Sequence, residues 1–125
     1  MKFSRIVFIG LFTAATFSTS PAFAEGDVKV GKRVFNKCKA CHDIRPGKNK
    51  IGPSLHGVVG RKAGTAPGYR YSPALKKADL TWTEENLHKY LENPRKMIRG
   101  TRMAFAGLRS KKERDDVIAY LKSLK

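Results

Sequence analysis

Two cysteines and a histidine stand within five residues of one another, in the run Cys38-Lys39-Ala40-Cys41-His42. On a helical turn, positions i, i+3 and i+4 share one face, so Cys38, Cys41 and His42 can all address one flat object. The Cys-x-x-Cys-His spacing is that of covalent haem attachment: the thiols add across the two vinyl groups, and the imidazole reaches the iron from the same side. The single motif predicts one haem c, held covalently through Cys38 and Cys41.

Other uses of a close cysteine pair fit this chain less well. A thioredoxin-like redox pair needs a βαβ context, which the sequence does not provide. A four-ligand zinc site needs a second pair of ligands, and His56 and His88 are too scattered to form one. A disulfide across a two-residue gap would close a very small loop and stabilise the fold little. We therefore interpret the pair as a haem anchor.

An iron held by His42 either binds a sixth ligand or keeps an open site. Met97 falls in a short turn after Pro94, whereas Met103 falls in the glycine-bounded loop 100–107. A loop methionine can be aimed across a pocket, while a methionine on a helix usually fills the core. This favours Met103 as the sixth ligand, with His56, His88 and Met97 as alternatives.

The elements expected to position these groups are helical. Asp27 is a suitable N-cap for an amphipathic helix that leads through Val34 and Phe35 to the cysteines. Residues 44–72 are rich in glycine, proline and lysine and are predicted to form a long loop. A loop of that length in a small domain is usually functional or wraps around something.

Further helices are expected in the second half of the chain, and no strand is expected there. The signals are two N-cap and proline pairs, a capping-box pattern and an apolar stripe on a last helix that begins near Lys112. In chain order they are Ser72-Pro73, starting a helix to Ala78; Thr81-Trp82-Thr83-Glu84, starting a helix with Leu87, Tyr90 and Leu91 on its apolar side; Asn93-Pro94, starting a turn through Ile98; and Val117, Ile118, Leu121 and Leu124.

Residues 1–24 have the composition of a cleaved export signal. Lys2 and Arg5 form a basic start, an apolar run follows, and Ala22-Phe23-Ala24 supplies the small-x-small pattern that signal peptidase recognises. The apolar run of about ten residues is roughly half of what a bilayer-spanning helix needs. We expect cleavage after Ala24, a periplasmic location and a mature domain of residues 25–125, with an uncleaved anchor as the alternative.

The chain is strongly basic, with 26 Lys and Arg against 10 Asp and Glu. Loss of Lys2 and Arg5 with the signal lowers the formal charge from +16 to +14, which predicts acidic partners. Export argues against nucleic acid as a partner, and transient contact with an anionic membrane surface stays open. Cations close in sequence to the haem motif and to the Met103 loop are expected to steer docking: Lys37, Lys39, Arg95, Lys96 and Arg102.

Several further segments form a recognisable set. They are Gly52-Pro53-Ser54-Leu55-His56-Gly57, Gly60-Arg61-Lys62, Ala66-Pro67-Gly68-Tyr69-Arg70-Tyr71, Thr81-Trp82, Tyr90-Leu91-Glu92-Asn93-Pro94, Gly100-Thr101-Arg102-Met103-Ala104-Phe105-Ala106-Gly107 and Ile118-Ala119-Tyr120-Leu121-Lys122. With the haem motif, they make the chain resemble mitochondrial-type class I cytochromes c and their bacterial periplasmic relatives over nearly all of residues 26–125.

The resemblance implies an all-α cytochrome c fold, in which the N- and C-terminal helices cross and shorter helices and loops wrap one haem. It places Gly31 and Phe35 near Val117 and Tyr120 at that crossing. It also implies the site: His42 and Met103 as the axial pair, a hydrogen bond from the His42 ring to the Pro53 carbonyl, and propionate contacts from Arg61, Tyr71 and Trp82.

The activity that the resemblance implies is one-electron transfer by a monomeric carrier that is not an enzyme. Its partners would be a quinol-oxidising cytochrome complex and a terminal oxidase or reductase. A haem peroxidase or gas-binding protein with an open sixth site is the competing hypothesis. The sequence departs from the family pattern at Leu75, where an asparagine is common, and at Arg99, where a proline usually precedes the Gly-Thr pair.

Overall fold

The computed structural model describes Ala15 and residues 25–125, and every regular element in this part of the chain is helical. The expected all-α class is confirmed. Apart from Ala15, the predicted export signal lies outside the described residues. The elements in chain order are α1 (Val28–Val34), the 3₁₀ helix η1 (Phe35–Lys37), α2 (Pro73–Lys77), α3 (Glu84–Glu92), α4 (Pro94–Met97) and α5 (Lys111–Lys122).

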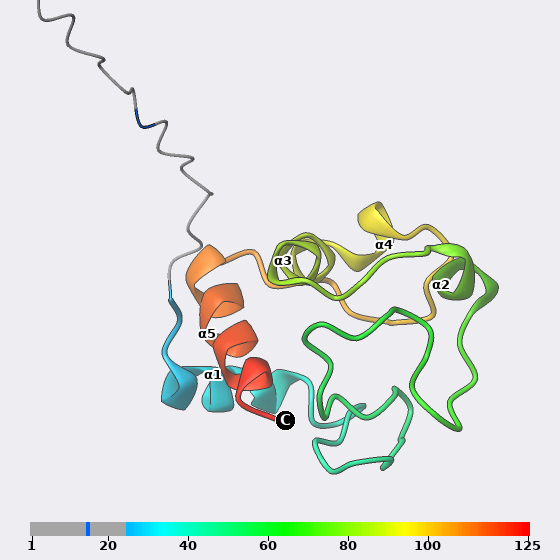
Figure 1. Cartoon of the computed structure of the whole chain (residues 1–125), viewed down its shortest axis with the longest axis horizontal. Helices are drawn as coiled ribbons and strands as arrows, with labels where there is room; N and C mark the ends of the chain where they lie inside the picture. The colour runs from blue at the N-terminus through cyan, green and yellow to red at the C-terminus, as the bar shows by residue number, and fades with distance from the viewer. Residues whose placement is uncertain (1–14, 16–24) are drawn as a thin grey trace, which may run out of the picture.

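The first and last helices pack against each other on one side of the molecule (Figure 1). Gly31 of α1 makes the close approach, because a Cβ atom at this position would lie 1.9 Å from the Asp116 carbonyl oxygen of α5. The Phe35 and Tyr120 rings meet beside it, with centroids 5.6 Å apart. The expected contact between the terminal helices is therefore confirmed.

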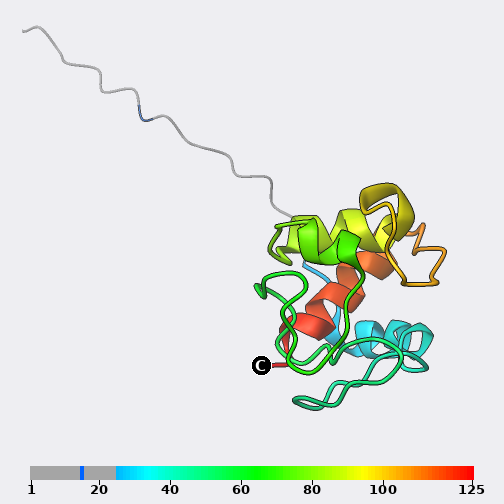
Figure 2. The same ribbon diagram turned by 90° about the vertical axis from the view of Figure 1, so that its right-hand side faces the viewer.

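The segment between η1 and α2 forms wide turns on the side away from α1 and α5 (Figures 1 and 2). Side chains hold these turns together. Asn49 accepts a hydrogen bond from the Ser54 N–H (3.0 Å) and donates one to the Pro67 carbonyl (2.9 Å). The Tyr69 hydroxyl donates to the Ile51 carbonyl at 2.7 Å. The predicted loop 44–72 is confirmed, with an isolated antiparallel bridge from Lys62 to Thr81 as its one extended pairing.

Three expected helix starts are confirmed by their caps. The Asp27 carboxylate accepts hydrogen bonds from the backbone N–H groups of residues 29 and 30 at the start of α1. The Ser72 hydroxyl caps α2 and the Asn93 side chain caps α4, and each helix has proline at its first position. These side chains satisfy donors that have no partner inside a helix.

The predicted start of α3 was wrong by two residues. Its N-cap is Thr83 rather than Thr81, and the Thr83 hydroxyl accepts from the Asn86 N–H at 3.1 Å. Thr81 and Trp82 are instead held in extended backbone, because Trp82 N–H donates to the Arg61 carbonyl at 2.8 Å. Pairing with a distant loop therefore overrides the local capping pattern.

The last helix begins at Lys111, one residue before the expected start, after the N-cap Ser110. Its predicted apolar stripe, with Val117, Ile118 and Leu121, is buried, and Leu124 lies just beyond the helix. The stripe packs in one core with the apolar side of α3. No helix in the described part of the chain is long and apolar enough to cross a bilayer.

Candidate haem site

A cavity of about 250 Å³ lies between the helices and the loops. Cys38, Cys41 and His42 line it, and Met103 lines it from the segment between α4 and α5. The cavity therefore brings together the four residues that the sequence assigned to the haem. Most of the remaining lining is apolar and includes Leu55, Val58, Leu75, Leu87, Leu91, Phe105, Val117 and Leu121.

The haem motif forms a tight turn directly after η1. The N–H groups of Cys41 and His42 both lie 3.0 Å from the Cys38 carbonyl oxygen, so the three functional side chains come from one turn of backbone. The two thiols are half-buried and are not joined to each other. Burial raises the pKa of the Cys38 thiol to about 11. A thioether carries no ionisable proton, so covalent attachment at this position suits its surroundings.

His42 is held in one orientation and one tautomer. Its Nδ1 lies 2.8 Å from the Pro53 carbonyl oxygen, and because a carbonyl can only accept, Nδ1 carries the proton. The ring also packs on Gly52, where a Cβ atom would come within 2.3 Å of the His42 Cε1. Burial lowers the pKa of His42, which favours the neutral ring. Nε2 is left with a free lone pair, the form that binds a metal.

Arg61 provides a test of whether the cavity suits a haem. Two of its guanidinium nitrogens donate to the carbonyls of His56 (3.2 Å) and Ser54 (3.1 Å). Its Nε is buried and has no hydrogen-bond partner within the described residues. A buried donor without an acceptor is costly, and Arg61 lines the cavity. A carboxylate bound there would remove that cost, so the residues present fit a propionate-bearing group.

Tyr71 and Trp82 also line the cavity, and both are buried. The Tyr71 oxygen accepts a hydrogen bond from the Ala66 N–H at 3.0 Å, and its own hydroxyl proton can be donated to another acceptor. The Trp82 ring packs against the Tyr90 ring with centroids 4.9 Å apart. The structure thus brings both side chains to the cavity, and their predicted contact with the propionates stays a prediction.

The segment that carries Met103 is anchored before the methionine. The Met103 N–H donates to the Thr101 hydroxyl oxygen at 3.3 Å, and the Tyr90 hydroxyl lies 2.7 Å from the same oxygen. Burial raises the pKa of Tyr90, so it remains a hydroxyl at neutral pH. Helix α3 thus positions the start of the loop that carries Met103.

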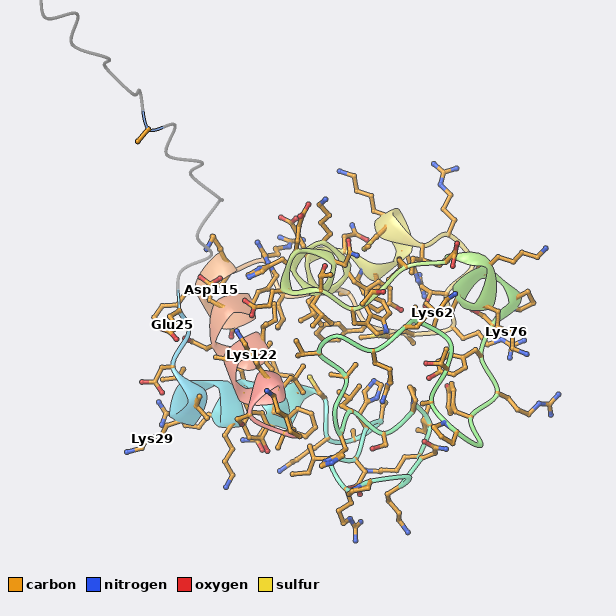
Figure 3. The ribbon with its side chains drawn as sticks, viewed as in Figure 1. Glu25, Lys29, Lys62, Lys76, Asp115 and Lys122 are labelled. Atoms are coloured by element: carbon orange, nitrogen blue, oxygen red, sulfur yellow. The ribbon has the colours of Figure 1, made fainter. Side chains whose placement is uncertain are left out.

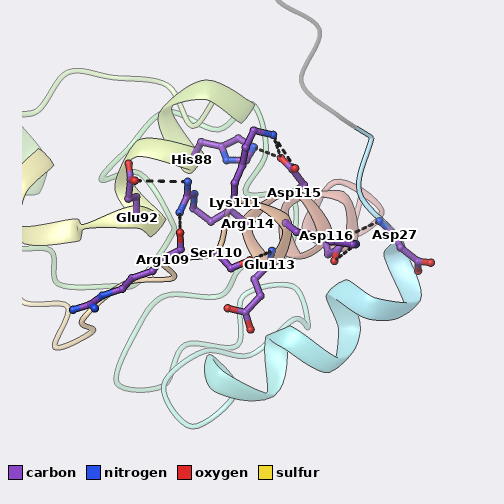
Figure 4. Close-up of polar contacts among 11 residues, drawn as sticks. Asp27, His88, Glu92, Arg109, Ser110, Lys111, Glu113, Arg114, Asp115 and Asp116 are labelled. Atoms are coloured by element: carbon purple, nitrogen blue, oxygen red, sulfur yellow. Dashed lines mark hydrogen bonds and ion pairs between the residues drawn. The ribbon is translucent and has the colours of Figure 1, made fainter.

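The same segment is anchored again after the methionine, and Figure 4 shows one of these contacts, from Arg114 to Arg109. The Leu108 N–H donates to the Leu91 carbonyl at 2.7 Å, and the Arg114 guanidinium donates to the carbonyls of Leu108 (2.5 Å) and Arg109 (2.9 Å). Gly107 has φ +106°, and a Cβ atom there would lie 2.1 Å from the Glu92 carbonyl oxygen. The loop is irregular, but both of its ends are fixed.

The rival ligands lie outside the cavity lining. Met97 is on α4 and packs against the core. His88 lies between α3 and α5, with its Nε2 3.0 Å from an Asp115 carboxylate oxygen. His56 is in the loop and does not line the cavity either. Across residues 25–125, no group of three His, Cys, Asp or Glu side chains gathers as a metal site would require.

The five cations predicted for docking are all exposed (Lys37, Lys39, Arg95, Lys96 and Arg102). Lys37 and Arg102 border the cavity, and Lys37 also forms an ion pair with Glu113 at 2.6 Å. No acidic residue of the described chain lines the cavity. Positive charge is not confined to this edge, because Lys29 and Lys76 lie at opposite ends of the molecule (Figure 3).

The sequence analysis missed three positioning residues. Gly52 could have been recognised as a close approach, because it directly precedes a proline beside the haem motif. Thr101 stands in the glycine-bounded loop but had no identifiable partner before the fold was known. From the sequence alone, Arg114 would be interpreted as an exposed cation on a helix. In the structure its side chain is 9% exposed and donates to a backbone carbonyl. Of the two departures from the family pattern, Leu75 lines the cavity and Arg99 is exposed outside it.

Comparison with known proteins agrees with the fold and the site. The family described as Cytochrome c matches residues 28–125. Cytochrome c of Euglena viridis is 52% identical over 101 residues, which cover 80% of this chain and 99% of the relative. Cytochrome c2 of Rhodomicrobium vannielii is 46% identical over 122 residues, covering 97% of this chain and 95% of the relative. The structure of cytochrome cH from Methylobacterium extorquens superposes with a TM-score of 0.76 at 49% identity, covering 78% of this chain and 99% of that one.

The fold and the site define a small all-α haem protein, and the chain belongs to the class I cytochrome c family. It is an electron carrier and not an enzyme, and its partners are redox proteins. Its cofactor is haem c, for which Cys38 and Cys41 have the spacing of the attachment motif.

Proposed function

We propose that this chain is a periplasmic one-electron carrier whose haem iron is bound axially by His42 and Met103. The observation that carries the proposal is that one cavity is lined by the attachment cysteines, by His42 and by Met103. The orientation of His42 by the Pro53 carbonyl supports its part, because that contact leaves Nε2 free to bind the metal.

The haem supplies a reversible one-electron couple between ferric and ferrous iron. The residues of the chain would set the reduction potential of this couple. The soft Met103 thioether would favour the ferrous state, and the apolar lining would disfavour the extra charge of the ferric state. Arg61, Tyr71 and Trp82 would hold the propionates, for which the unpartnered Arg61 Nε is the strongest support. If His42 and Met103 both bind the iron, no coordination position would be left for a substrate.

The proposed partners are a quinol-oxidising cytochrome complex as donor and a terminal oxidase or reductase as acceptor, both with acidic docking faces. Lys37, Lys39, Arg95, Lys96 and Arg102 steer these encounters, and their effect should weaken as salt rises. The carrier acts as a monomer, with transient contact to anionic membrane surfaces and none to nucleic acid. The exposure of the five cations supports their role in docking.

The periplasmic location is supported by the export pattern in residues 1–24 and by the similarity to a bacterial cytochrome c2 over 97% of the chain. Cleavage after Ala24 leaves Glu25 as the first residue of the mature protein. Intact mass of the purified protein, with haem staining after denaturing electrophoresis, measures the cleavage position, the haem count and the covalent attachment together.

Substitution of each methionine tests the axial assignment. Met103→Ala should abolish the low-spin, methionine-ligated spectrum, lower the reduction potential and open a coordination position with peroxidase activity. Met97→Ala is the matched control, because it removes the same side chain from outside the cavity, and it should leave spectrum and potential close to those of the wild type. An unchanged spectrum in Met103→Ala, or a change confined to Met97→Ala, would reject the assignment.

A further inference from the structure

Ile51 is the most exposed large apolar residue in the described part of the chain. The residue is 77% exposed, and Val28, on α1, is the other exposed large apolar residue there, at 44%. A single exposed apolar residue is common on protein surfaces and by itself indicates nothing. The position of Ile51 is unusual, because it borders the haem cavity whereas Val28 does not.

The exposure of Ile51 is built into a rigid turn. Its carbonyl accepts the Tyr69 hydroxyl at 2.7 Å. On either side, the Lys50 N–H donates to the Gly52 carbonyl (2.9 Å), and the Gly52 N–H donates to the Cys41 carbonyl (2.7 Å). Gly52 in turn lies against the His42 ring. The apolar side chain is thus presented to solvent by backbone that is tied to the haem motif.

Two exposed lysines lie close to this side chain. Lys50 is its neighbour in the chain, and the Lys50 ammonium donates to the Lys39 carbonyl at 2.5 Å, which brings Lys39 near it as well. The nearest acidic residue along the chain, Asp43, is engaged by the Arg45 side chain through two hydrogen bonds of 2.9 and 2.7 Å. Ile51 is therefore an exposed apolar side chain beside two exposed lysines, with its nearest acidic neighbour in the chain already paired.

We infer that Ile51 is the apolar anchor of the docking surface, and that it inserts into an apolar depression ringed by carboxylates on an acidic redox protein. The inference rests on the carrier function proposed above and adds the residue that seats the partner. Complementary charges govern how often partners meet, while a desolvated apolar contact at the centre governs how long they stay. The two lysines, Lys39 and Lys50, and the Ile51 side chain thus have separable roles.

The experiment measures electron transfer from the reduced, haem-loaded protein to a purified, detergent-solubilised terminal oxidase over a range of ionic strengths. Ile51→Ser should raise KM roughly tenfold or more, since fully burying one aliphatic side chain contributes at least about that factor, without altering the slope of the rate against ionic strength. Ile51→Leu should restore KM. Val28→Ser is the matched control, and its KM should equal that of the wild type.

Other results would overturn the inference. One is an equal KM for wild type and Ile51→Ser; another is an equal loss with the small acceptor hexacyanoferrate(III), which would assign the effect to the haem surroundings. The wild type could also self-associate or bind anionic vesicles. If Ile51→Ser abolishes either behaviour, Ile51 contacts a second copy of the chain or a membrane rather than a redox protein. A wild-type protein that reduces hexacyanoferrate(III) but not the oxidase would contradict the proposed acceptor instead.

Discussion

The two sides of the cavity are built in different ways. On one side, α1 and α5 pack so closely that Gly31 has room for no side chain, and ring and aliphatic side chains fill the contact. On the other side, residues 43–72 and 100–110 have no regular helix and are held by individual hydrogen bonds from Asn49, Tyr69 and Arg114. The cavity lies where these two kinds of structure meet.

This difference separates stability from function. A helix contact gains from many small interactions, so we expect the α1 and α5 contact to contribute strongly to the folding free energy. The loops, with the haem-motif turn that precedes the first of them, carry His42, Pro53, Arg61 and Met103, which line the cavity. Loops can present side chains at angles that a helix does not allow, and here each loop is tied down by a few specific contacts.

The largest effect is expected at the helix contact. Gly31→Ala forces a Cβ atom to within 1.9 Å of the Asp116 carbonyl oxygen, which is backbone and cannot rotate away. We expect a loss of about 3 kcal/mol in the free energy of unfolding, measured by denaturant titration of the haem-loaded protein. The higher helix propensity of alanine acts in the opposite direction, so it cannot cause the loss.

Gly47→Ala is the control for the same chemical change in the loops. Gly47 has φ +66°, and a Cβ atom added there would meet no other atom within 4 Å, so the cost is the backbone strain alone, about 1 kcal/mol. An equal loss for both substitutions would mean that the helix contact yields more easily than its geometry indicates.

A smaller effect is expected on the loop side. Asn49→Ala removes the acceptor for the Ser54 N–H and the donor to the Pro67 carbonyl. Leaving one part-buried donor without its partner should cost about 2 kcal/mol. Hydrogen exchange should speed up in residues 43–56 and 65–71 more than in α1 and α5, since the Asn49 side chain joins these two stretches of one loop.

Asn36→Ala, at an exposed position of η1, is the control for Asn49→Ala. It should change the free energy of unfolding by less than about 0.5 kcal/mol. Uniform acceleration of exchange across loops and helices in Asn49→Ala would show that the two sides unfold as one unit and would remove the distinction between them.

The same distinction explains what the sequence could predict. The α1, α2, α4 and α5 starts follow from local rules, because Asp27, Ser72, Asn93 and the apolar stripe act within one or two turns of helix. The haem motif is local as well. Family resemblance placed Pro53, Arg61, Tyr71, Trp82 and Met103 around one site, and each lines the cavity.

The features that the sequence analysis got wrong or missed depend on contacts between distant segments of the chain. Thr81 was assigned as a helix cap from its neighbours alone, but its segment pairs with residues 60–63, and this moves the helix start. The burial of Arg114 depends on where the methionine loop ends, which the spacing of charges on α5 does not reveal. Sequence patterns describe a turn or a helix face, whereas these two contacts arise when loops and helices meet.

The smallest expected effect is a pH dependence in the polar contacts between α3 and α5 (Figure 4). Burial lowers the pKa of His88, and the cations Arg114 and Lys111 act in the same direction, while Asp115 and Glu84 oppose them. The His88 Nε2 lies 3.0 Å from Asp115, whose carboxylate also accepts two hydrogen bonds from Lys111 at 2.9 and 3.1 Å. The contact is thus a hydrogen bond from a neutral imidazole to a carboxylate that already has a cation.

The sign of the pH effect follows from this lowered pKa. Below about pH 6.5 the unfolded chain takes up a proton at His88 that the folded protein does not, so the free energy of unfolding should fall as the pH drops from 7 to 5.5. His88→Gln keeps an amide donor for Asp115 but does not titrate, and its stability should vary less over this range. A wild-type stability that rises on acidification relative to His88→Gln would show that a charged His88–Asp115 pair outweighs the burial.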